Sequence, residues 1–199
     1  PQMPVDPIQI HPLDLAGTSV SEKLELVRGA LVDTGSDACV LTTLDDVAWL
    51  FNIRGRDVPY NPVVIAYGIV TASDAYLFVD PRKVDDAIRE TLGNQGVTMA
   101  LYDEFEQKLT GIAKGCRRVL VDGGSVNSRI VDCLSGVTAV LMGKSPVSLP
   151  KAIKNETELN GMRAAHLRDG VAMVKFLVWL EKAVPKGGMT EISAAEKLE

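Results

Sequence analysis

Short apolar segments alternate with helical patterns along most of this chain, and this alternation constrains the fold more than any other feature. Strands are predicted at residues 37–41, 63–71, 75–79, 97–101, 117–121 and 137–141, and helices at 20–34, 43–51, 80–93, 102–114 and 126–134. Such alternation is typical of an α/β sandwich. Only the turn Ala72-Ser73-Asp74 separates the second strand from the third, which indicates an antiparallel hairpin. We therefore predict an α/β fold whose mixed sheet of about six strands is flanked by helices.

The two ends of the chain have a different character. Residues 1–17 contain four prolines and little periodicity, which predicts an extended linker with a short strand around Ile8 to Ile10. Residues 18–150 are predicted to form the α/β domain, and residues 151–199 a helical extension. The main helix of this extension is predicted from Glu156 to Val184.

Local signals mark both ends of that main helix. Asn155 with Glu158 indicates a capping box at its start, and Pro185 with Gly187 its end. Thr190 is predicted to cap a second helix.

The composition is that of a globular protein with a core of its own. Hydrophobic residues make up 46% of the chain and charged residues 24%. A net charge of −5 gives no reason to expect nucleic acid or an anionic membrane as partner. The chain has three cysteines, an odd number, and no two of them form a CxxC pair. This pattern favours a reducing, cytoplasmic location. The longest apolar tract, Val171 to Leu180, is too short to cross a bilayer, and we identify no signal peptide.

Residues that could carry out catalysis are scarce. His11 lies in the proline-rich segment, and His166 lies on the apolar side of the terminal helix, where a packing role is expected. The acidic pairs Asp45-Asp46 and Asp85-Asp86 each fall in the first turn of a predicted helix. Adjacent side chains on a helix point about 100° apart, so we expect these carboxylates to cap helices rather than to share one metal ion.

Two glycine-containing segments resemble phosphate-binding loops only in part. Gly143-Lys144-Ser145 lacks the required earlier glycine, since that position is Thr138, and Pro146 prevents a helix from starting after the serine. Residues 122–125 (Asp-Gly-Gly-Ser) lie between a strand and a helix, where we expect a tight turn. We therefore predict neither catalytic nor metal-binding residues in this chain.

Two longer motifs carry a family resemblance. The first runs from Leu44 to Val58 and continues with Asn61-Pro62-Val63. The second comprises residues 154–158, 161–166, 169, 179–181 and 190–195. In this order they resemble the cytosolic Xaa-Pro aminopeptidases of the creatinase/prolidase ("pita-bread") superfamily, from about Asp14 to Glu199. The resemblance implies that residues 1–17 follow a preceding domain, that 18–150 are a creatinase-like second domain, and that 151–199 begin the catalytic pita-bread domain.

The resemblance also implies an activity. Enzymes of this family remove the N-terminal residue of peptides with proline at position two, using two divalent ions, usually manganese. The metal ligands would lie beyond Glu199, so this segment would bind no metal and would be inactive alone. Its α/β domain would help to shape and cover the entrance for short Xaa-Pro peptides. Trp49, Asn52 and Arg54 are candidate residues at that entrance, although a structural role for each remains an alternative.

The terminal helix carries a further expectation. Leu159, Met162, Phe176 and Leu180 would expose an apolar patch without the rest of the catalytic domain, so the helix is predicted to fold back or to self-associate. Three other functions remain open. They are a non-catalytic protein-binding relative, another superfamily enzyme such as prolidase, and a nucleotide-binding α/β domain.

Overall fold

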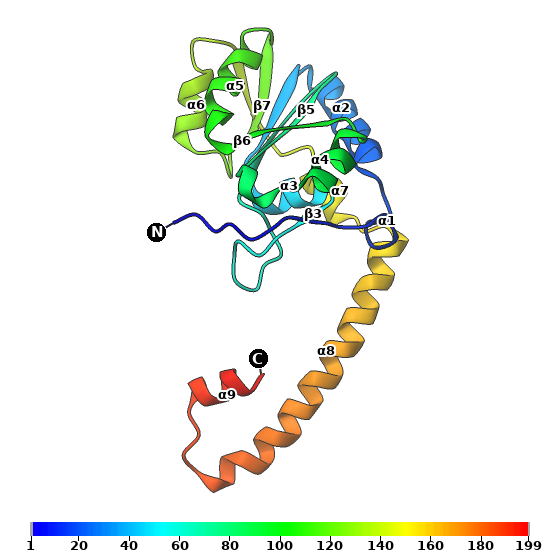
Figure 1. The fold of residues 1–199 in the computed structure, drawn as a ribbon, viewed down its shortest axis with the longest axis vertical. Coiled ribbons are helices and arrows are strands. Elements are labelled where there is room, and N and C mark those ends of the chain that lie inside the picture. Colours follow the sequence, from blue (N-terminus) through cyan, green and yellow to red (C-terminus); the bar gives the residue numbers. More distant parts are fainter. Residues whose placement is uncertain (1, 199) are drawn as a thin grey trace. The chain divides into compact units, whose positions relative to one another are not determined.

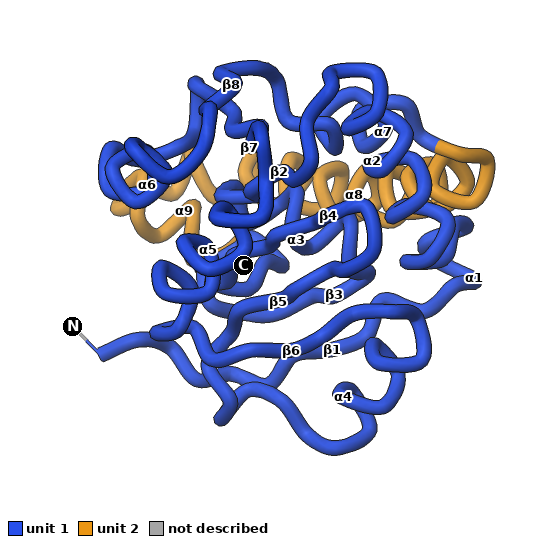
Figure 2. Tube along the Cα trace, turned by 90° about the horizontal axis from the view of Figure 1, so that it is seen from above, with its two compact units in different colours: residues 1–154 blue, residues 155–199 orange. Residues whose placement is uncertain are grey.

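The structure, a computed structural model, describes residues 2–198 and divides into two compact units. The first unit is Pro1–Lys154 and the second is Asn155–Glu199 (Figures 1 and 2). Each unit has its own helices, and each is described by itself below.

The first unit is built on a six-stranded mixed sheet, as predicted. The strand order is β6 (Val97–Leu101), β5 (Ala75–Val79), β4 (Ala66–Thr71), β2 (Ala38–Leu41), β7 (Arg118–Asp122) and β8 (Ala139–Gly143), and Figure 2 shows the strands in this order. β4 pairs antiparallel with both β5 and β2, whereas the pairs β5–β6, β2–β7 and β7–β8 are parallel. The antiparallel hairpin in the middle of the sheet is therefore confirmed.

Helices cover both faces of this sheet (Figure 1). The helices of the unit are α1 (Leu13–Ala16), α2 (Val20–Thr34), α3 (Leu44–Leu50), α4 (Asp86–Gly93), α5 (Phe105–Ala113), α6 (Ser128–Leu134) and α7 (Ser148–Ala152). Because successive strand residues point to opposite faces, Cys39 and Leu41 pack with α2, α3 and α4, whereas Ala38 and Val40 pack with α5 and α6. The unit thus has one apolar core on each side of the sheet.

The N-terminal segment packs on the same unit. Ile8 is 3% exposed and belongs to the core that contains α2 and α3. The next two residues form β1 (Gln9–Ile10), which pairs antiparallel with β3 (Ile53–Arg54). The short strand predicted around Ile8 to Ile10 is confirmed, and it is held by a segment more than forty residues later in the chain.

One predicted helix is divided in the structure. Residues 80–93 form a single 3-10 turn, η1 (Pro81–Lys83), then an extended residue, Val84, and only then α4. The turn separates from the helix because the Lys83 side chain points into the protein interior, where it is fully buried. Asp85, rather than Asp80, caps α4, and its carboxylate accepts a hydrogen bond from the amide of Ile88. A similar 3-10 turn, η2 (Tyr102–Glu104), precedes α5.

The second unit consists of α8 (Glu156–Ala183), the 3-10 turn η3 (Val184–Lys186) and α9 (Glu191–Leu198). The capping box of Asn155 and Glu158 is confirmed, with both reciprocal hydrogen bonds present. Thr190 also caps α9 as predicted, because its hydroxyl accepts a hydrogen bond from the amide of Ser193.

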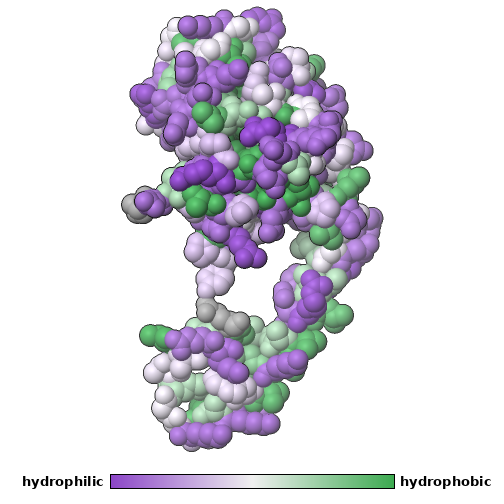
Figure 3. Space-filling view, in the orientation of Figure 1, coloured by the Kyte–Doolittle hydropathy of each residue, from purple (hydrophilic) through white to green (hydrophobic). Residues whose placement is uncertain are grey.

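The surface of α8 is rich in apolar side chains, and no residue of this helix is buried (Figure 3). Of the four residues expected to form an exposed patch, Met162 is exposed, and Leu159, Phe176 and Leu180 are half-buried. Additional exposed apolar residues are Leu167, Val171, Met173, Val174, Leu177 and Val178. His166 is exposed too, so the packing role expected for it is not seen in residues 2–198. Within those residues, no helix is long and apolar enough to cross a membrane.

Candidate functional site

The three predicted entrance residues lie close together at the end of α3 and in β3. Trp49 belongs to the last turn of α3, Asn52 follows that helix, and Arg54 is in the two-residue strand β3. The chain reverses direction at Asn52, whose φ of 48° is in the left-handed region. Asparagine tolerates this conformation better than most residues, which explains an asparagine at this helix end.

Asn52 is buried, and its polar groups connect three segments of the unit. Its side-chain oxygen accepts a hydrogen bond from Lys23 Nζ of α2 at 2.6 Å, and its side-chain nitrogen donates to the Thr18 carbonyl at 2.9 Å. Its backbone carbonyl accepts a hydrogen bond from the amide of His11 at 2.7 Å. Asn52 therefore fixes the positions of the N-terminal segment, α2 and α3 relative to one another.

Trp49 and Arg54 also make contacts within the unit. Lys23 Nζ lies 4.1 Å from the centroid of the Trp49 ring and donates a hydrogen bond to the Trp49 carbonyl at 2.9 Å. This cation–π contact accounts for a tryptophan above a buried lysine. Arg54 Nη1 donates to the carbonyl of Ala48, near the end of α3, at 3.0 Å. The structure thus gives all three residues a structural role, and direct contact with a substrate stays a prediction.

The segment after β3, residues 55–65, forms a loop that extends from the body of the unit (Figure 1). We call it the 55–65 loop. Its two sides meet at Gly55, where an added Cβ would lie 2.7 Å from a methyl group of Val64 and 3.0 Å from the Val63 carbonyl oxygen. Because any larger side chain would force these sides apart, glycine is required at this position.

A buried ion pair holds the base of the 55–65 loop. Lys83 Nζ of η1 lies 2.5 Å from Asp57 Oδ2, and the exposed fractions of the two side chains are 0% and 1%. The same carboxylate oxygen accepts a hydrogen bond from the amide of Ile65 at 2.6 Å. The other oxygen, Asp57 Oδ1, is buried and makes no hydrogen bond within residues 2–198. An ion pair removed from water in this way is strongly sensitive to the loss of either partner.

Tyr60 lies at the tip of this loop and was not identified from the sequence. It has a φ of 62°, and 90% of its surface is exposed. Apart from Asn52, no other described residue except glycine has a positive φ. The only local signal is that Pro59 and Pro62 enclose Tyr60 and Asn61, which indicates a turn without indicating which side chain it presents.

A second polar cluster joins α3 to α7 and differs from the prediction for Asp45 and Asp46. Both carboxylates bind the ammonium group of Lys151, with Asp46 Oδ1 at 2.7 Å. Asp46 Oδ2 also accepts a hydrogen bond from the Ser145 hydroxyl at 2.6 Å. The expectation that these carboxylates only cap α3 was wrong. Although the two residues are adjacent, both of their side chains reach the ammonium group of Lys151, a residue far along the chain.

The charges of this cluster shift the pKa values of its members. Burial raises the pKa of Asp45, but the hydrogen bond and charge of Lys151 outweigh it, so the pKa is lowered. Burial likewise lowers the pKa of Lys151, while its bonds to both aspartates raise it further, so the net direction is upward. Both shifts favour the charged forms, and the cluster is therefore a stable ionic link between α3 and α7.

Residues 122–125 form a tight turn, as predicted. Asp122 accepts hydrogen bonds from the amides of Gly124 at 2.8 Å and Ser145 at 2.9 Å. The bond from Ser145 is the main reason why the pKa of Asp122 lies below its ordinary value. Because a carboxylate already occupies these amides, this edge of the sheet does not present them to a phosphate group.

The described residues do not fit a metal centre. No group of three or more His, Cys, Asp or Glu side chains in residues 2–198 is arranged to hold a metal ion. His11 belongs to the first unit and His166 to the second. Hard cations prefer several oxygen ligands, but the adjacent carboxylates of Asp45 and Asp46 already pair with the ammonium group of Lys151.

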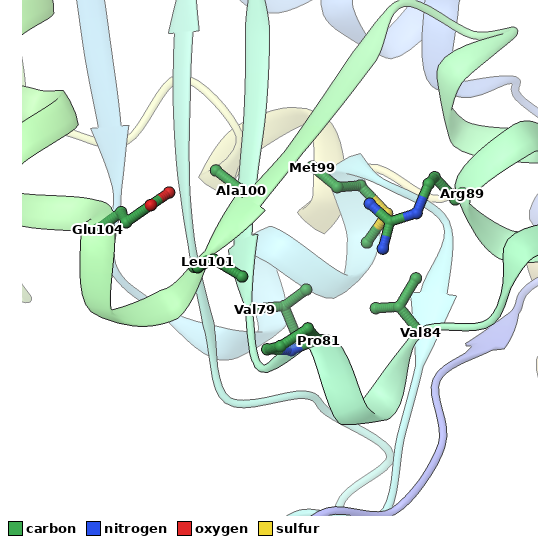
Figure 4. A pocket seen from close by; sticks show the side chains of 8 residues that line it. All are labelled: Val79, Pro81, Val84, Arg89, Met99, Ala100, Leu101 and Glu104. Atoms are coloured by element: carbon green, nitrogen blue, oxygen red, sulfur yellow. The ribbon is translucent and has the colours of Figure 1, made fainter.

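A small surface pocket at one end of the sheet is also a poor candidate for a peptide-binding site. One pocket of about 140 Å³ lies where β5 and β6 end, and Figure 4 shows the side chains of Arg89 and Met99 beside each other on one side of it. Its lining residues are Val79, Pro81, Val84, Arg89, Met99, Ala100, Leu101 and Glu104. Ligand pockets usually measure about 300–1,000 Å³, so this one is too small to hold a peptide.

Comparison with known proteins identifies the family of this chain. The family model described as the Creatinase/Prolidase N-terminal domain matches residues 1–158. The chain is 38% identical over 213 residues to a probable Xaa-Pro aminopeptidase P of Metarhizium acridum (strain CQMa 102). It is 37% identical over 227 residues to aminopeptidase P2 of Arabidopsis thaliana. Both alignments include the whole chain but only 34% and 32% of the relatives, so the chain spans about a third of their length.

Solved structures extend the comparison. An X-prolyl aminopeptidase of Caenorhabditis elegans, described as a cytosolic enzyme with a di-nuclear active site, matches the whole chain with a TM-score of 0.89 and 33% identity. The chain covers 33% of that structure. A Xaa-Pro dipeptidase of Bacillus anthracis matches 91% of the chain with a TM-score of 0.65, but at 16% identity it shows only a shared fold. The resemblance inferred from the two motifs is thus confirmed, and the chain belongs to the creatinase/prolidase N-terminal domain family.

Proposed function

We propose that the protein containing this chain is a metal-dependent Xaa-Pro aminopeptidase, which removes the N-terminal residue from peptides with proline at position two. The observation that carries this proposal is the match of the whole chain to the C. elegans X-prolyl aminopeptidase at 33% identity. The two curated relatives named above, both aminopeptidases P, agree with it. Cytoplasmic location is part of the proposal, since that C. elegans enzyme is described as cytosolic.

Within such an enzyme, the first unit would have no catalytic chemistry of its own. Residues 2–198 offer no metal site, and the relatives are about three times as long as this chain. We therefore place the ligands of two divalent ions, with manganese as the proposed metal, in the remaining part of the protein. The α/β unit would shape and cover the entrance to the active site, and the motif that contains Trp49, Asn52 and Arg54 would hold the entrance side of this unit rigid.

A comparison of two protein lengths tests the proposal. The full-length protein and residues 1–199 are each assayed with a tripeptide that has proline at position two, with a matched tripeptide that has alanine there, and with an Xaa-Pro dipeptide. The full-length protein is expected to cleave only the proline tripeptide rapidly, to lose activity with a chelator and to regain it with manganese. Residues 1–199 are expected to be inactive.

The same assay separates the alternatives. Cleavage of the dipeptide in preference to the tripeptide would support a prolidase. Absence of any cleavage by full-length protein loaded with manganese, cobalt or zinc would support a non-catalytic protein-binding relative. Either result would overturn the proposed activity while leaving the family membership unchanged.

A further inference from the structure

The pocket at the ends of β5 and β6 lies where the connections of two neighbouring strands diverge. β5 is followed by η1 and α4, and Ile88 and Leu92 of that helix pack in one apolar core. β6 is followed by η2 and α5, and Phe105 and Leu109 of that helix pack in the core on the opposite face of the sheet. β5 and β6 are parallel neighbours, so the pocket lies between their diverging connections. Ligands of open α/β sheets bind at such points.

A second point of this kind, between β2 and β7, is occupied by the protein's own side chains. β2 leads into α3, which packs in the first core, and β7 leads into α6, which packs in the second. Thr42, directly after β2, and Ser125, which follows β7, share a hydrogen bond between their hydroxyl groups at 2.9 Å. The Asp122 carboxylate also binds the Ser145 amide there. The point between β5 and β6, by contrast, holds the pocket.

The walls of this pocket are mostly apolar. Val79, Val84, Met99 and Leu101 contribute to its lining. Leu101 leaves 45% of its surface exposed, and a ligand with a hydrocarbon group would remove part of this apolar surface from water. An apolar cavity of about 150 Å³ accommodates benzene. The volume of about 140 Å³ therefore matches a hydrocarbon group of similar size.

One side of the pocket carries a cation. Arg89 of α4 lies beside Met99, and Figure 4 shows Arg89 and Glu104 on opposite sides of the pocket. Within residues 2–198, the Arg89 guanidinium pairs with no carboxylate. Arg28 and Arg82 of the same unit, by contrast, each pair with one. A guanidinium group is suited to bind a carboxylate through two parallel hydrogen bonds.

We propose that this pocket binds a small aliphatic carboxylate, whose hydrocarbon group packs against Val79, Val84 and Leu101 and whose carboxylate pairs with Arg89. Glu104 on the opposite side disfavours the reverse orientation, because like charges repel. Two sources share this chemistry, namely a free carboxylic acid and the C-terminal residue of a polypeptide chain. The proposal does not depend on the proposed peptidase activity.

The methyl group of Met99 reports on the pocket in the full-length protein. Its nuclear magnetic resonance signal, assigned with the variant Met99→Leu, is followed while isocaproate is added. We expect a saturable shift at millimolar concentrations, because the ligand has few non-hydrogen atoms. Isocaproamide has the hydrocarbon group without the charge, and acetate has the charge without most of the hydrocarbon. Each should bind about tenfold more weakly than isocaproate.

Variants test the two halves of the pocket separately. Arg89→Gln should raise the isocaproate concentration needed for half-saturation about tenfold, because it removes the partner of the carboxylate. Leu101→Ala should raise it about fivefold, because it removes part of the apolar wall. Arg82→Gln is the matched control, since Arg82 is a nearby arginine of η1 that pairs with Asp80 and does not line the pocket. It should bind isocaproate as the wild type does.

The outcomes decide the proposal. A Met99 signal that does not move with isocaproate would overturn it. Equal weakening by Arg89→Gln and Arg82→Gln would also overturn it, because the acid would then respond only to the charge of the surface. So would acetate binding as strong as that of isocaproate. N-acetyl-leucine distinguishes the sources: tighter binding than isocaproate supports the site with a polypeptide C-terminus as ligand, and weaker binding supports it with a free acid.

Discussion

Lys83 Nζ lies 2.5 Å from Asp57 Oδ2, and both side chains are shielded from water. The pair joins η1 to the 55–65 loop, and the backbone carbonyl of Lys83 also accepts a hydrogen bond from the amide of Ile8 at 2.9 Å. One lysine therefore holds the loop and the N-terminal segment against the α/β unit. The position of Tyr60 depends on this contact, because the loop that carries Tyr60 has its base there.

Lys83→Met should destabilise residues 1–199 by about 3–5 kcal/mol, because the carboxylate of Asp57 would remain buried without its counter-ion. Urea unfolding followed by circular dichroism measures the change. The double variant Asp57→Leu/Lys83→Met should recover much of the loss, since it leaves no buried charge unpaired. Arg82→Met is the control at the adjacent position, where the arginine pairs with Asp80 at the surface. If Lys83→Met and Arg82→Met have equal, small effects, the ion pair is not buried as described.

Lys23→Met should also be destabilising, by about 2 kcal/mol, because the side-chain oxygen of Asn52 and the Trp49 carbonyl would lose a buried donor. Methionine retains the length of the side chain, so the change isolates the ammonium group. Lys108→Met is the control, since Lys108 is exposed and lies over the Tyr76 ring at 4.8 Å. A Lys23→Met variant as stable as Lys108→Met would contradict the interpretation that Lys23 holds α2 and α3 together.

Features encoded by neighbouring residues were predictable from the sequence. Alternating apolar residues located all six strands of the main sheet to within about three residues, and the Asn155–Glu158 capping box needs only four consecutive residues. The turn at Asp122 is likewise local, since its carboxylate binds the amide two residues later. For such features, the partner is fixed by the sequence spacing itself.

Features that depend on distant partners were not predictable. Asp46 has the spacing of a capping residue, yet its partner Lys151 lies 105 residues later. Lys83 appears in a helical pattern but is drawn into the interior by Asp57, 26 residues earlier, which divides the predicted helix. The positive φ and the exposure of Tyr60 carry no periodic or compositional signal in the sequence.

Cys39 should be unreactive in the folded protein. Burial raises the pKa of its thiol to about 12, so almost no thiolate is present at pH 8. Iodoacetamide should therefore modify Cys39 only after unfolding in urea, whereas Cys116 and Cys133, which are half-buried, should react first. Mass spectrometry of tryptic peptides identifies the modified residues. Rapid modification of Cys39 without denaturant would show that β2 opens to solvent in the native state.

Asp122→Asn should weaken the link between the end of β7 and the segment before α7, with a characteristic pH dependence. The pKa of Asp122 is lowered in the folded chain, chiefly by the amide of Ser145, so its carboxylate contributes stability that is complete above the unfolded-state value of 3.8. That stability is lost as the pH falls through the lower, folded-state pKa. The substitution should therefore cost about 1 kcal/mol at neutral pH and less near about pH 3, which lies below the unfolded-state value.

Urea midpoints of the wild type and of Asp122→Asn at these two pH values measure the difference. Asp132→Asn, an exposed carboxylate on α6, is the matched control and should give nearly the wild-type midpoint at pH 7. A destabilisation by Asp122→Asn that is equally large at both pH values would mean that the carboxylate charge is not what the amides of Gly124 and Ser145 bind. A loss that is smaller at the lower pH would show that the charged carboxylate of Asp122 holds Ser145, whose hydroxyl donates a hydrogen bond to Asp46 of α3.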